Sequence, residues 1–423
     1  MKRFIALTTL IMPLLSGGQT LTECQQAAER NYPLISQYDL ISKTTDLTVA
    51  NIQKGWLPQV SAQAQVTWQT DVTSFPESMQ NLYQQAGINM RGLRKDQYRV
   101  GIDVRQTIFD GGAISNRKEI TRRQGAVEEA QTDVAMYQVR QRVNEMYFGL
   151  LLLNEQIRLN GNLQKLLSSN ERKLLAMFER GTAAESDYLS VKAERLNVAQ
   201  QAITLDAQRQ AVMKMLSAFC GIEVKTVEKP AAPVTETQPT RQRPELEAIN
   251  ARLRLADAQE KALNAAIMPQ LSVFAQGFYG YPGYNMFEDM MHRQWSLNGM
   301  VGARLTWNIG ALYTHKNDKA KIQQQRNINE TNRSVFVFNN NIEQIRQREN
   351  IECFRRLIAD DAEIISLRTK VRQAAESKLA HGIADVNDLL KEINAENNAW
   401  VDQAIHEIKM LKEMYDLKFT TNN

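Results

Sequence analysis

Residues 60–68, VSAQAQVTW, alternate between apolar and polar side chains along their whole length. Successive side chains of a strand point to opposite faces, so this segment has one apolar face and one polar face. The apolar members are Val60, Ala62, Ala64, Val66 and Trp68. Its length is close to the roughly 9–11 residues that a tilted strand needs to cross a bilayer. The segment therefore predicts a strand whose apolar face a membrane or a protein core must cover.

Three more segments share this pattern. Residues 98–104 and 297–309 alternate cleanly, whereas 271–281 is less regular because Phe274 and Phe278 share a face with polar residues. We interpret the four segments as two hairpins. Their polar face carries charged side chains, which we expect to line the lumen of a barrel: Arg99, Asp103, Arg105 and Arg304.

Alternation alone leaves two architectures open for these strands. A soluble sandwich would leave the polar face in solvent and cover the apolar face with a second sheet. A membrane barrel would place aromatic side chains near the strand ends, at the interface between lipid and water. Aromatic residues lie at such positions: Trp68, Phe109, Tyr279, Tyr281 and Trp307. Together with an export signal, they favour the barrel.

The distribution of proline predicts very long helices. None of the ten prolines lies between Pro76 and Pro230 or after Pro282, and proline breaks helix interiors. We expect one helix over about 113–180, with a heptad seam made of Val139, Val143, Met146, Leu150, Leu153 and Ile157. On the returning helix, the packed stripe is expected to be Leu189, Ala193, Leu196, Ile203 and Ala207.

A second pair of long helices is predicted in the other half of the chain. Leu357, Ile364 and Val371 recur every seven residues. The return is lined by Trp400, Ala404, Ile408, Leu411 and Tyr415. Helices this long cannot bury their stripes against a compact domain, so they must pack on their antiparallel partners and on neighbouring hairpins.

The two halves are predicted to be copies of each other. Positions match in register at Pro33/Pro244 and Pro58/Pro269, and again at Gly181/Gly382 and Asp187/Asp388. We divide the chain into a signal peptide at 1–18, a first repeat at 19–222, a linker at 223–243 and a second repeat at 244–423. The proline content of 223–243 is typical of a linker.

The start of the chain has the layout of a secretory signal peptide. A basic beginning is followed by an apolar run and by small residues before an expected cleavage near Gly18. Thr22 and Gln25 resemble a capping box, so we expect the first helix to open there and to end before Pro58. Cys24 is expected to be a helix residue and not a lipidation site, because Glu23 stands where lipidation needs a small side chain.

Composition argues against several classes of function. The 423 residues carry a formal net charge of only +4, which is too balanced for a nucleic-acid binder. The three cysteines are widely spaced, and the four histidines show no ligand spacing and are expected at the surface. Gly111 and Gly112 lack the rest of a dinucleotide or P-loop motif. We therefore expect no catalytic residues, no metal site, no cofactor and no enzymatic activity.

Four strands are too few to form a barrel within one chain. The smallest natural barrels have about eight strands. An open sheet edge in lipid would leave backbone groups without hydrogen bonds. Closure therefore needs several chains, and three copies would supply twelve strands and twelve helical segments.

Several short motifs, in this order and spacing, resemble the TolC-like outer-membrane factor family. They are Asn31-Tyr32-Pro33, Leu57-Pro58-Gln59, Phe109-Asp110-Gly111-Gly112 and the segment from Gly181 to Asp187, with much of this echoed in the second copy. The resemblance implies a mainly α fold with membrane β. Long antiparallel coiled-coil hairpins would form a periplasmic α-barrel, and four strands per chain would contribute to the twelve-stranded β-barrel of a homotrimer.

The resemblance also implies a location and partners. The protein would lie in the outer membrane of a Gram-negative bacterium, in contact with outer membrane lipid, and would extend into the periplasm. It would serve as the exit duct of tripartite efflux or of type I secretion. A periplasmic adaptor and an inner-membrane transporter would be its partners, and the transporter would supply the energy.

In this family the turns between the long helices carry the functional residues. By resemblance, the adaptor-docking helical tips match Gly181, Asp187 and Gly382, and the gate or aperture matches Asp385, Asp388 and Lys391. The gate arginine of the family is Ala384 here, and its second ring carboxylate is Lys391. Three carboxylates that face one another across a narrow pore attract cations. The alternative is that Asp187 and Asp388 are first-turn residues favoured by the helix dipole.

Two functions of different classes remain. The first is a trimeric outer-membrane export channel. The second is a periplasmic coiled-coil adaptor or scaffold without a membrane barrel. The four alternating segments distinguish them, because an adaptor needs no residues that face lipid.

Overall fold

The computed structural model describes residues 18–90, 92–233 and 243–422. The predicted signal peptide lies outside them apart from Gly18, as does 234–242 of the predicted linker. The chain forms two compact units. The first contains residues up to 38, 130–248 and from 333 onward, and the second contains 39–129 and 249–332. Each unit therefore draws on both halves of the sequence.

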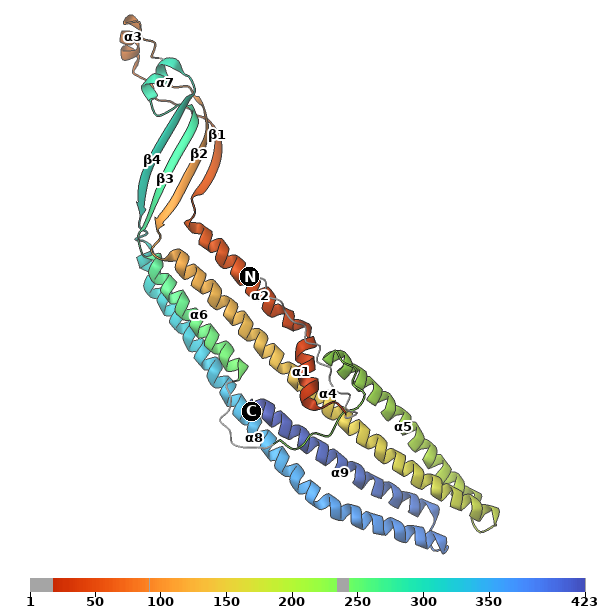
Figure 1. Ribbon diagram of the computed structural model, residues 1–423. Helices are drawn as coiled ribbons and strands as arrows, with labels where there is room; N and C mark the ends of the chain where they lie inside the picture. Colours follow the sequence, from red (N-terminus) through yellow and green to blue (C-terminus); the bar gives the residue numbers. More distant parts are fainter. Residues whose placement is uncertain (1–17, 91, 234–242, 423) are drawn as a thin grey trace, which may run out of the picture. The chain divides into compact units, whose positions relative to one another are not determined.

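The second unit contains one antiparallel sheet of four strands, in the order β1-β2-β3-β4 (Figure 1). The strands are β1 (Gln59–Trp68), β2 (Asp96–Phe109), β3 (Gln270–Tyr281) and β4 (Ser296–Thr306). All four predicted strands are confirmed. Short helices lie in the loops at one end of the sheet, namely α3 (Glu77–Gln85) and α7 (Met286–His292).

A turn at Asp110 converts β2 into a long helix. The buried Asp110 carboxylate accepts hydrogen bonds from the amides of Gly112, at 2.8 Å, and Ile114, at 2.6 Å. Gly111 and Gly112 have φ of 65° and 88°, in the left-handed region that favours glycine. These glycines therefore form the turn between β2 and the helix that follows.

Four long helices account for most of the first unit. They are α4 (Ala113–Glu179), α5 (Glu185–Cys220), α8 (Ala311–Ala380) and α9 (Val386–Thr421). Two of them, α4 and α8, also extend into the second unit. The long stretches without proline are thus helices, as predicted. The remaining helices are α2 (Ser36–Gln53), α6 (Pro244–Ala266) and the short 3-10 turn η2 (Lys54–Trp56).

The first helix differs from its prediction in two ways. The capping box is formed by Thr20 and Glu23, and not by Thr22 and Gln25, so the cap of α1 (Leu21–Asn31) lies two residues earlier than predicted. The helix also ends well before Pro58, because Pro33 starts the 3-10 turn η1 (Pro33–Ile35) and α2 follows it. Cys24 lies inside α1 and is fully buried, as expected for a helix residue.

Helix α4 is the centre of the first unit. One apolar cluster joins it to α1, to the end of α5 and to α9, and includes Val139, Val143 and Leu150 of the predicted seam. A second cluster lies near the helix ends, where Leu167 meets Val198 and Ile393. The predicted seam of α4 is therefore confirmed at these positions.

Within the single chain, the predicted stripe of α5 is not the row that faces α4. Its members are all exposed: Leu189, Ala193, Leu196, Ile203 and Ala207. Val191 and Val198, also seven residues apart, are buried instead. Both rows have heptad spacing, so periodicity could not tell which one faces α4.

The predicted seam of α8 is also exposed to solvent in the single chain, at Leu357, Ile364 and Val371. The return helix α9 buries Ala404, Ile408 and Leu411, as predicted, and leaves Trp400 exposed.

One of the four histidines is not a surface residue. His406 is half-buried, and its Nδ1 lies 2.9 Å from a carboxylate oxygen of the buried Asp361, so this pair joins α9 to α8. Within the described ranges, none of the helices combines the length and the apolar composition that crossing a membrane requires.

Candidate functional site

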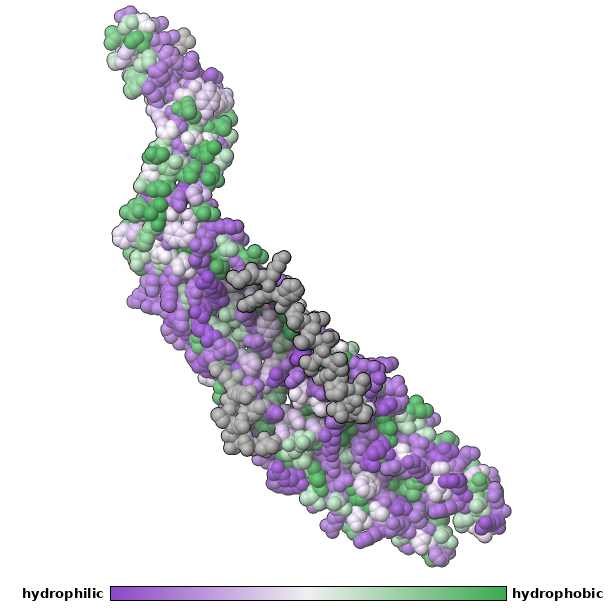
Figure 2. All heavy atoms as spheres, in the orientation of Figure 1, coloured by the Kyte–Doolittle hydropathy of each residue, from purple (hydrophilic) through white to green (hydrophobic). Residues whose placement is uncertain are grey.

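One face of the sheet is apolar and uncovered. Because opposite residues of paired strands share a face, the register places Val60, Val104 and Ala275 on the same side as Val301. Leu297 is 83% exposed and Val301 is 81% exposed. Figure 2 shows apolar residues gathered over the strands. A soluble sandwich would cover such a face, and the described chain has no second sheet to do so.

The opposite face is polar and carries all four predicted lumen residues. The register aligns Asp103 of β2 with Ser61 and Gln276, and Arg304 of β4 with Ser272. A groove of about 470 Å³ runs along this face and is lined in part by Asp103. The four residues are Arg99, Asp103, Arg105 and Arg304, and no ion pair joins any of them to another described residue. Three arginines against one aspartate leave this face positively charged.

The irregular strand β3 has a packing explanation. Phe278 is opposite Gly101 of β2, where an added Cβ would be 2.7 Å from the Phe278 Cβ. Phe274 is opposite Gly302 of β4, and its ring fills the space in which an added Cβ would be 2.8 Å from Cζ. The guanidinium carbon of Arg99 lies 3.9 Å from the Phe278 ring centroid. That of Arg304 lies 5.0 Å from the Phe274 ring centroid. Each ring is therefore capped by a cation, which keeps this face polar toward solvent.

Aromatic residues at the strand ends follow the prediction except at one position. Trp68, Tyr279 and Trp307 are exposed, whereas Tyr281 is buried against Leu93. The Tyr281 hydroxyl accepts a hydrogen bond from the Arg94 amide at 3.0 Å. Tyr281 therefore fixes the loops and does not belong to an interfacial row. A cluster of loop residues, which alternation does not reveal, buries it.

The sheet has two open edges. β1 pairs only with β2, and β4 pairs only with β3, in the part of the chain that the structure describes. Each edge therefore presents unpaired backbone groups, which form a template for another strand. The sheet of the described chain thus has two open edges, one exposed apolar face and one polar face.

The two turns between the long helices have the same backbone. Gly181 follows α4 with φ of 74°, and Gly382 follows α8 with φ of 69°. In both turns the amide of the next residue, Thr182 or Ile383, donates to the carbonyl oxygen five residues back at 2.9 Å. This bond and the left-handed glycine define a Schellman end.

The helices that follow the turns begin differently. Asp385 is the N-cap of α9, and its carboxylate accepts from the Asp388 amide at 2.8 Å. Ala184 takes this position in α5, and there the Asp187 carboxylate reaches back to the Ala184 amide at 3.2 Å. Asp388 and Lys391 are exposed, and no hydrogen bond or ion pair links either side chain to another described residue. Of the two equivalent aspartates, only Asp388 has a free carboxylate.

Polar contacts join the two hairpins near these turns. Asn394 of α9 donates to Glu194 of α5 at 3.0 Å, and Asn170 of α4 donates to Glu376 of α8 at 3.4 Å. Arg372 pairs with Glu376 at 2.9 Å, beside a cavity of about 290 Å³ between α4, α8 and α9. The charges and the cavity lie where the second hairpin meets the first.

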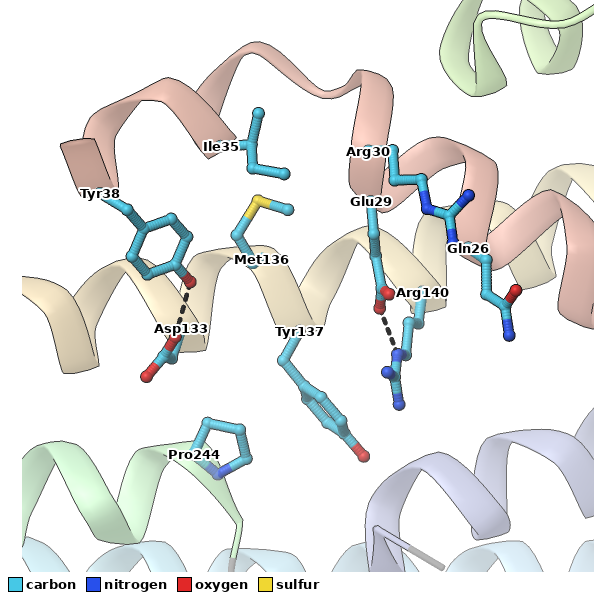
Figure 3. Close-up of a pocket in the computed structure, with 10 residues that line it drawn as sticks. All are labelled: Gln26, Glu29, Arg30, Ile35, Tyr38, Asp133, Met136, Tyr137, Arg140 and Pro244. Carbon is cyan, nitrogen blue, oxygen red and sulfur yellow. Dashed lines mark hydrogen bonds and ion pairs between the residues drawn. The ribbon is translucent and has the colours of Figure 1, made fainter. Parts of the chain in front are cut away.

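A second cavity, of about 540 Å³, opens between α1, η1 and α4 (Figure 3). Tyr38 donates to Asp133 at 2.6 Å, and Glu29 forms an ion pair with Arg140. These polar groups point toward one another, as Figure 3 shows. Because they satisfy each other, we assign no chemistry to this cavity.

One exposed residue was missed by sequence reasoning. Ile383 in the α8–α9 turn is 75% exposed. Its place beside Gly382 was visible in the sequence, but only the Schellman geometry shows that the side chain projects into solvent.

The sequence matches the family described as outer membrane efflux protein over residues 25–221. Several solved channels share the fold. The outer-membrane channel OprN aligns with a TM-score of 0.68 at 14% identity, over 95% of this chain and 89% of that chain. The CmeC outer membrane channel of Campylobacter jejuni aligns with a TM-score of 0.66 at 12% identity, over 95% of this chain and 85% of that chain. The outer membrane protein VceC of Vibrio cholerae aligns with a TM-score of 0.64 at 14% identity, over 95% of this chain and 96% of that chain. No curated protein matches the sequence.

The sheet and the long hairpins are thus those of an outer membrane channel fold. The resemblance to the TolC-like outer-membrane factors is confirmed, by the family match in the first half and by the fold over nearly the whole chain. The matching family is described as outer membrane efflux protein, and OprN and CmeC are outer-membrane channels.

Proposed function

We propose that this protein is the outer-membrane exit duct of a multicomponent export system. Three copies would join their sheets edge to edge into a twelve-stranded barrel, and the helical hairpins would form a tunnel in the periplasm. The observation that carries this proposal is the sheet itself, with an exposed apolar face, a charged opposite face and two open edges. In lipid, this arrangement is stable only when other copies close it.

The test is reconstitution of the full chain after detergent extraction. We expect a trimer by light scattering in detergent, heat-modifiable mobility on gels and conductance in planar bilayers. Extraction by salt alone, a monomer in solution and absence of conductance would overturn the channel. The alternative, a periplasmic adaptor or scaffold without a barrel, would then be favoured.

We place the periplasmic gate of the duct at the α8–α9 turn. The free Asp388 carboxylate supports this assignment, because three such groups around an axis would attract cations. Asp385 serves as a helix cap and adds a second negative charge, while Lys391 offsets part of it. The polar contacts between the hairpins can break and re-form when the turn moves.

Substitution of the two equivalent aspartates tests the gate. Asp388→Asn should weaken the cation preference of the pore, measured as the reversal potential across a salt gradient in planar bilayers. Asp187→Asn is the matched control and should leave the selectivity unchanged, because that carboxylate is bound to the Ala184 amide. Equal selectivity in both variants and the parent would remove Asp388 from the gate.

The two turns are also proposed as the docking surface for the periplasmic adaptor, which would connect the duct to an inner-membrane transporter. Their shared Schellman geometry at Gly181 and Gly382 and the exposed Ile383 support this role, since an isolated apolar side chain at a tip offers a contact to a partner. Ile383→Glu should abolish export-dependent drug resistance at unchanged membrane levels of the protein. Ile383→Val, which keeps an apolar side chain, should retain resistance. Full resistance in Ile383→Glu would argue against this surface.

A further inference from the structure

The fold brings together two cysteines that the sequence keeps 196 residues apart. Cys24 lies in α1 and Cys220 is the last residue of α5, and they are 0% and 2% exposed. The Cys220 Sγ lies 3.4 Å from the Cys24 carbonyl oxygen. A hydrogen bond between the two thiols, followed by burial, raises the pKa of Cys24 well above its ordinary value. The wide spacing in the sequence had given no reason to pair them.

The backbone around the two cysteines is fixed by other contacts. The Asn31 side chain donates to the carbonyl oxygens of Ala218 and Phe219, at 3.2 Å each, and so ties the end of α1 to the end of α5. The Gln19 amide donates to the Thr226 carbonyl oxygen at 2.9 Å. Both cysteines also belong to the apolar cluster around α4. These contacts hold α1 against α5 in a seam, so the two thiols lie together whether or not they are bonded to each other.

We propose that Cys24 and Cys220 form a disulfide bond in the exported protein. The proposal rests on the proposed outer-membrane function, because disulfides form and persist beyond the cytosol, where the compartment is oxidising. The third cysteine, Cys353, is exposed on α8 and stays a free thiol.

The bond forms by exchange with the disulfide of a thiol–disulfide oxidoreductase. The thiolate of one cysteine attacks the carrier disulfide, which gives a mixed disulfide and releases one carrier thiolate. The thiolate of the second cysteine then attacks the mixed disulfide and expels the other carrier thiolate. The two cysteines lose two protons and two electrons in total, and the carrier is reduced to a dithiol. Because both sulfur atoms are buried in the folded chain, the exchange precedes closure of the seam.

The bond would clamp the beginning of the first repeat to the end of its helical hairpin. It lies in the cluster that joins α1 to α4 and α5, and not in the cluster near the helix turns. It would therefore stabilise the first repeat while it leaves the turns free to move. A cross-link over so long a loop restricts the unfolded chain strongly, so reduction should lower the melting temperature.

The test counts free thiols. The full chain, exported in a Gram-negative host and purified in detergent without reductant, is denatured, treated with a maleimide and weighed by mass spectrometry. We expect one adduct, at Cys353, and three after reduction. Cys353→Ser should give none before reduction and two after. Cys24→Ser and Cys220→Ser should each give two adducts without reduction, because the remaining partner is released. Three adducts on the unreduced parent chain would overturn the disulfide.

A second measurement separates this proposal from the proposed function. The Cys353→Ser chain is denatured and reduced, and it is then refolded in buffers of reduced and oxidised glutathione, so that exchange can occur before the seam closes; the fraction of intramolecular disulfide is measured after alkylation. If the bond forms in a chain that neither trimerises nor conducts, the disulfide proposal is supported and the channel proposal is overturned. A conducting trimer whose two thiols stay reduced in every buffer would overturn the disulfide and support the channel.

Discussion

The two helical hairpins have nearly the same backbone, but the first buries its long helix and the second buries its short one. α4 and α8 have 67 and 70 residues, and α5 and α9 have 36 each. In the first hairpin the long helix is the buried member, and α5 buries only four residues. In the second hairpin α9 buries twelve residues, whereas the seam of α8 is exposed. Similar local sequence thus gave similar helices, and the neighbours of each helix decided which face is covered.

The exposed rows follow from this difference. α5 presents Leu189, Leu196 and Ile203, and α8 presents Leu357 and Ile364, all at heptad spacing. Apolar rows of this kind are the usual seam between helices. In the proposed trimer they would meet across the boundary between copies, so the exposed members of both hairpins become the contact surface.

The largest expected effect is in the core of the second hairpin. Ile393→Ala in α9 removes a side chain that is 1% exposed and should lower the free energy of unfolding by about 2–5 kcal/mol. Leu196→Ala in α5 is the control and should change the stability of the single chain by about 0.5 kcal/mol or less, because the residue is exposed. Denaturant titration followed by circular dichroism checks both. Equal losses of stability in the two variants would contradict the finding that α9 is buried while the row of Leu196 in α5 is exposed.

The next effect is on association. The double substitution Leu196→Glu and Ile203→Glu places charges in the exposed row of α5 and should convert the detergent-solubilised trimer to monomers, because a buried unpaired charge is costly. Helix content should stay unchanged, since both residues are exposed in the single chain. Gln208→Glu, at an exposed polar position of the same helix and about a third of a turn away from this row, is the matched control. Light scattering gives the mass, and an intact trimer in the double variant would show that this row is not an interface.

A smaller effect is expected at the turns, where the hairpins agree. Gly181→Ala and Gly382→Ala should each cost roughly 1–2 kcal/mol, because both glycines have φ near +70°. Gly149→Ala inside α4 is the control. Its Cβ would meet nothing within 4 Å, and alanine there should stabilise by about 0.5–1 kcal/mol. Thermal melts rank the three variants, and very different costs at the two turns would deny their common geometry.

The smallest effect concerns the helix caps, where the hairpins differ. Asp385→Ala removes the N-cap of α9 and should cost about 1 kcal/mol. Ala184→Asp supplies the missing cap to α5 and should gain a similar amount. Melting temperatures of the two variants should move in opposite directions. A fall in both would show that the α5 turn cannot accept a side-chain cap.

Elements with a strong local signal were predicted well. The alternation of 60–68 predicted a strand, and the absence of proline between Pro76 and Pro230 and after Pro282 predicted the long helices. The errors fell where two local solutions compete. The capping box is formed by Thr20 and Glu23 instead of Thr22 and Gln25. In α5 the row of Val191 and Val198 is buried, and the row that contains Leu189 and Leu196 is exposed. Each pair has the same local pattern, and contacts with other helices made the choice.

Of the candidate site, the sequence placed the charged residues on one face and the glycines at the turns. It could not show that Asp187 is bound while Asp388 is free, since that depends on whether each carboxylate reaches a backbone amide in the folded turn. Nor could it show that Tyr281 is buried by Leu93 from another loop.

The sequence by itself determined the kind of each element, because strand alternation and helix continuity are local properties of the chain. Only the tertiary structure decided which apolar rows are covered, which of two equal aspartates keeps a free charge and that Cys24 meets Cys220. Those outcomes depend on residues far apart along the chain, and a local pattern holds no information about which of them become neighbours.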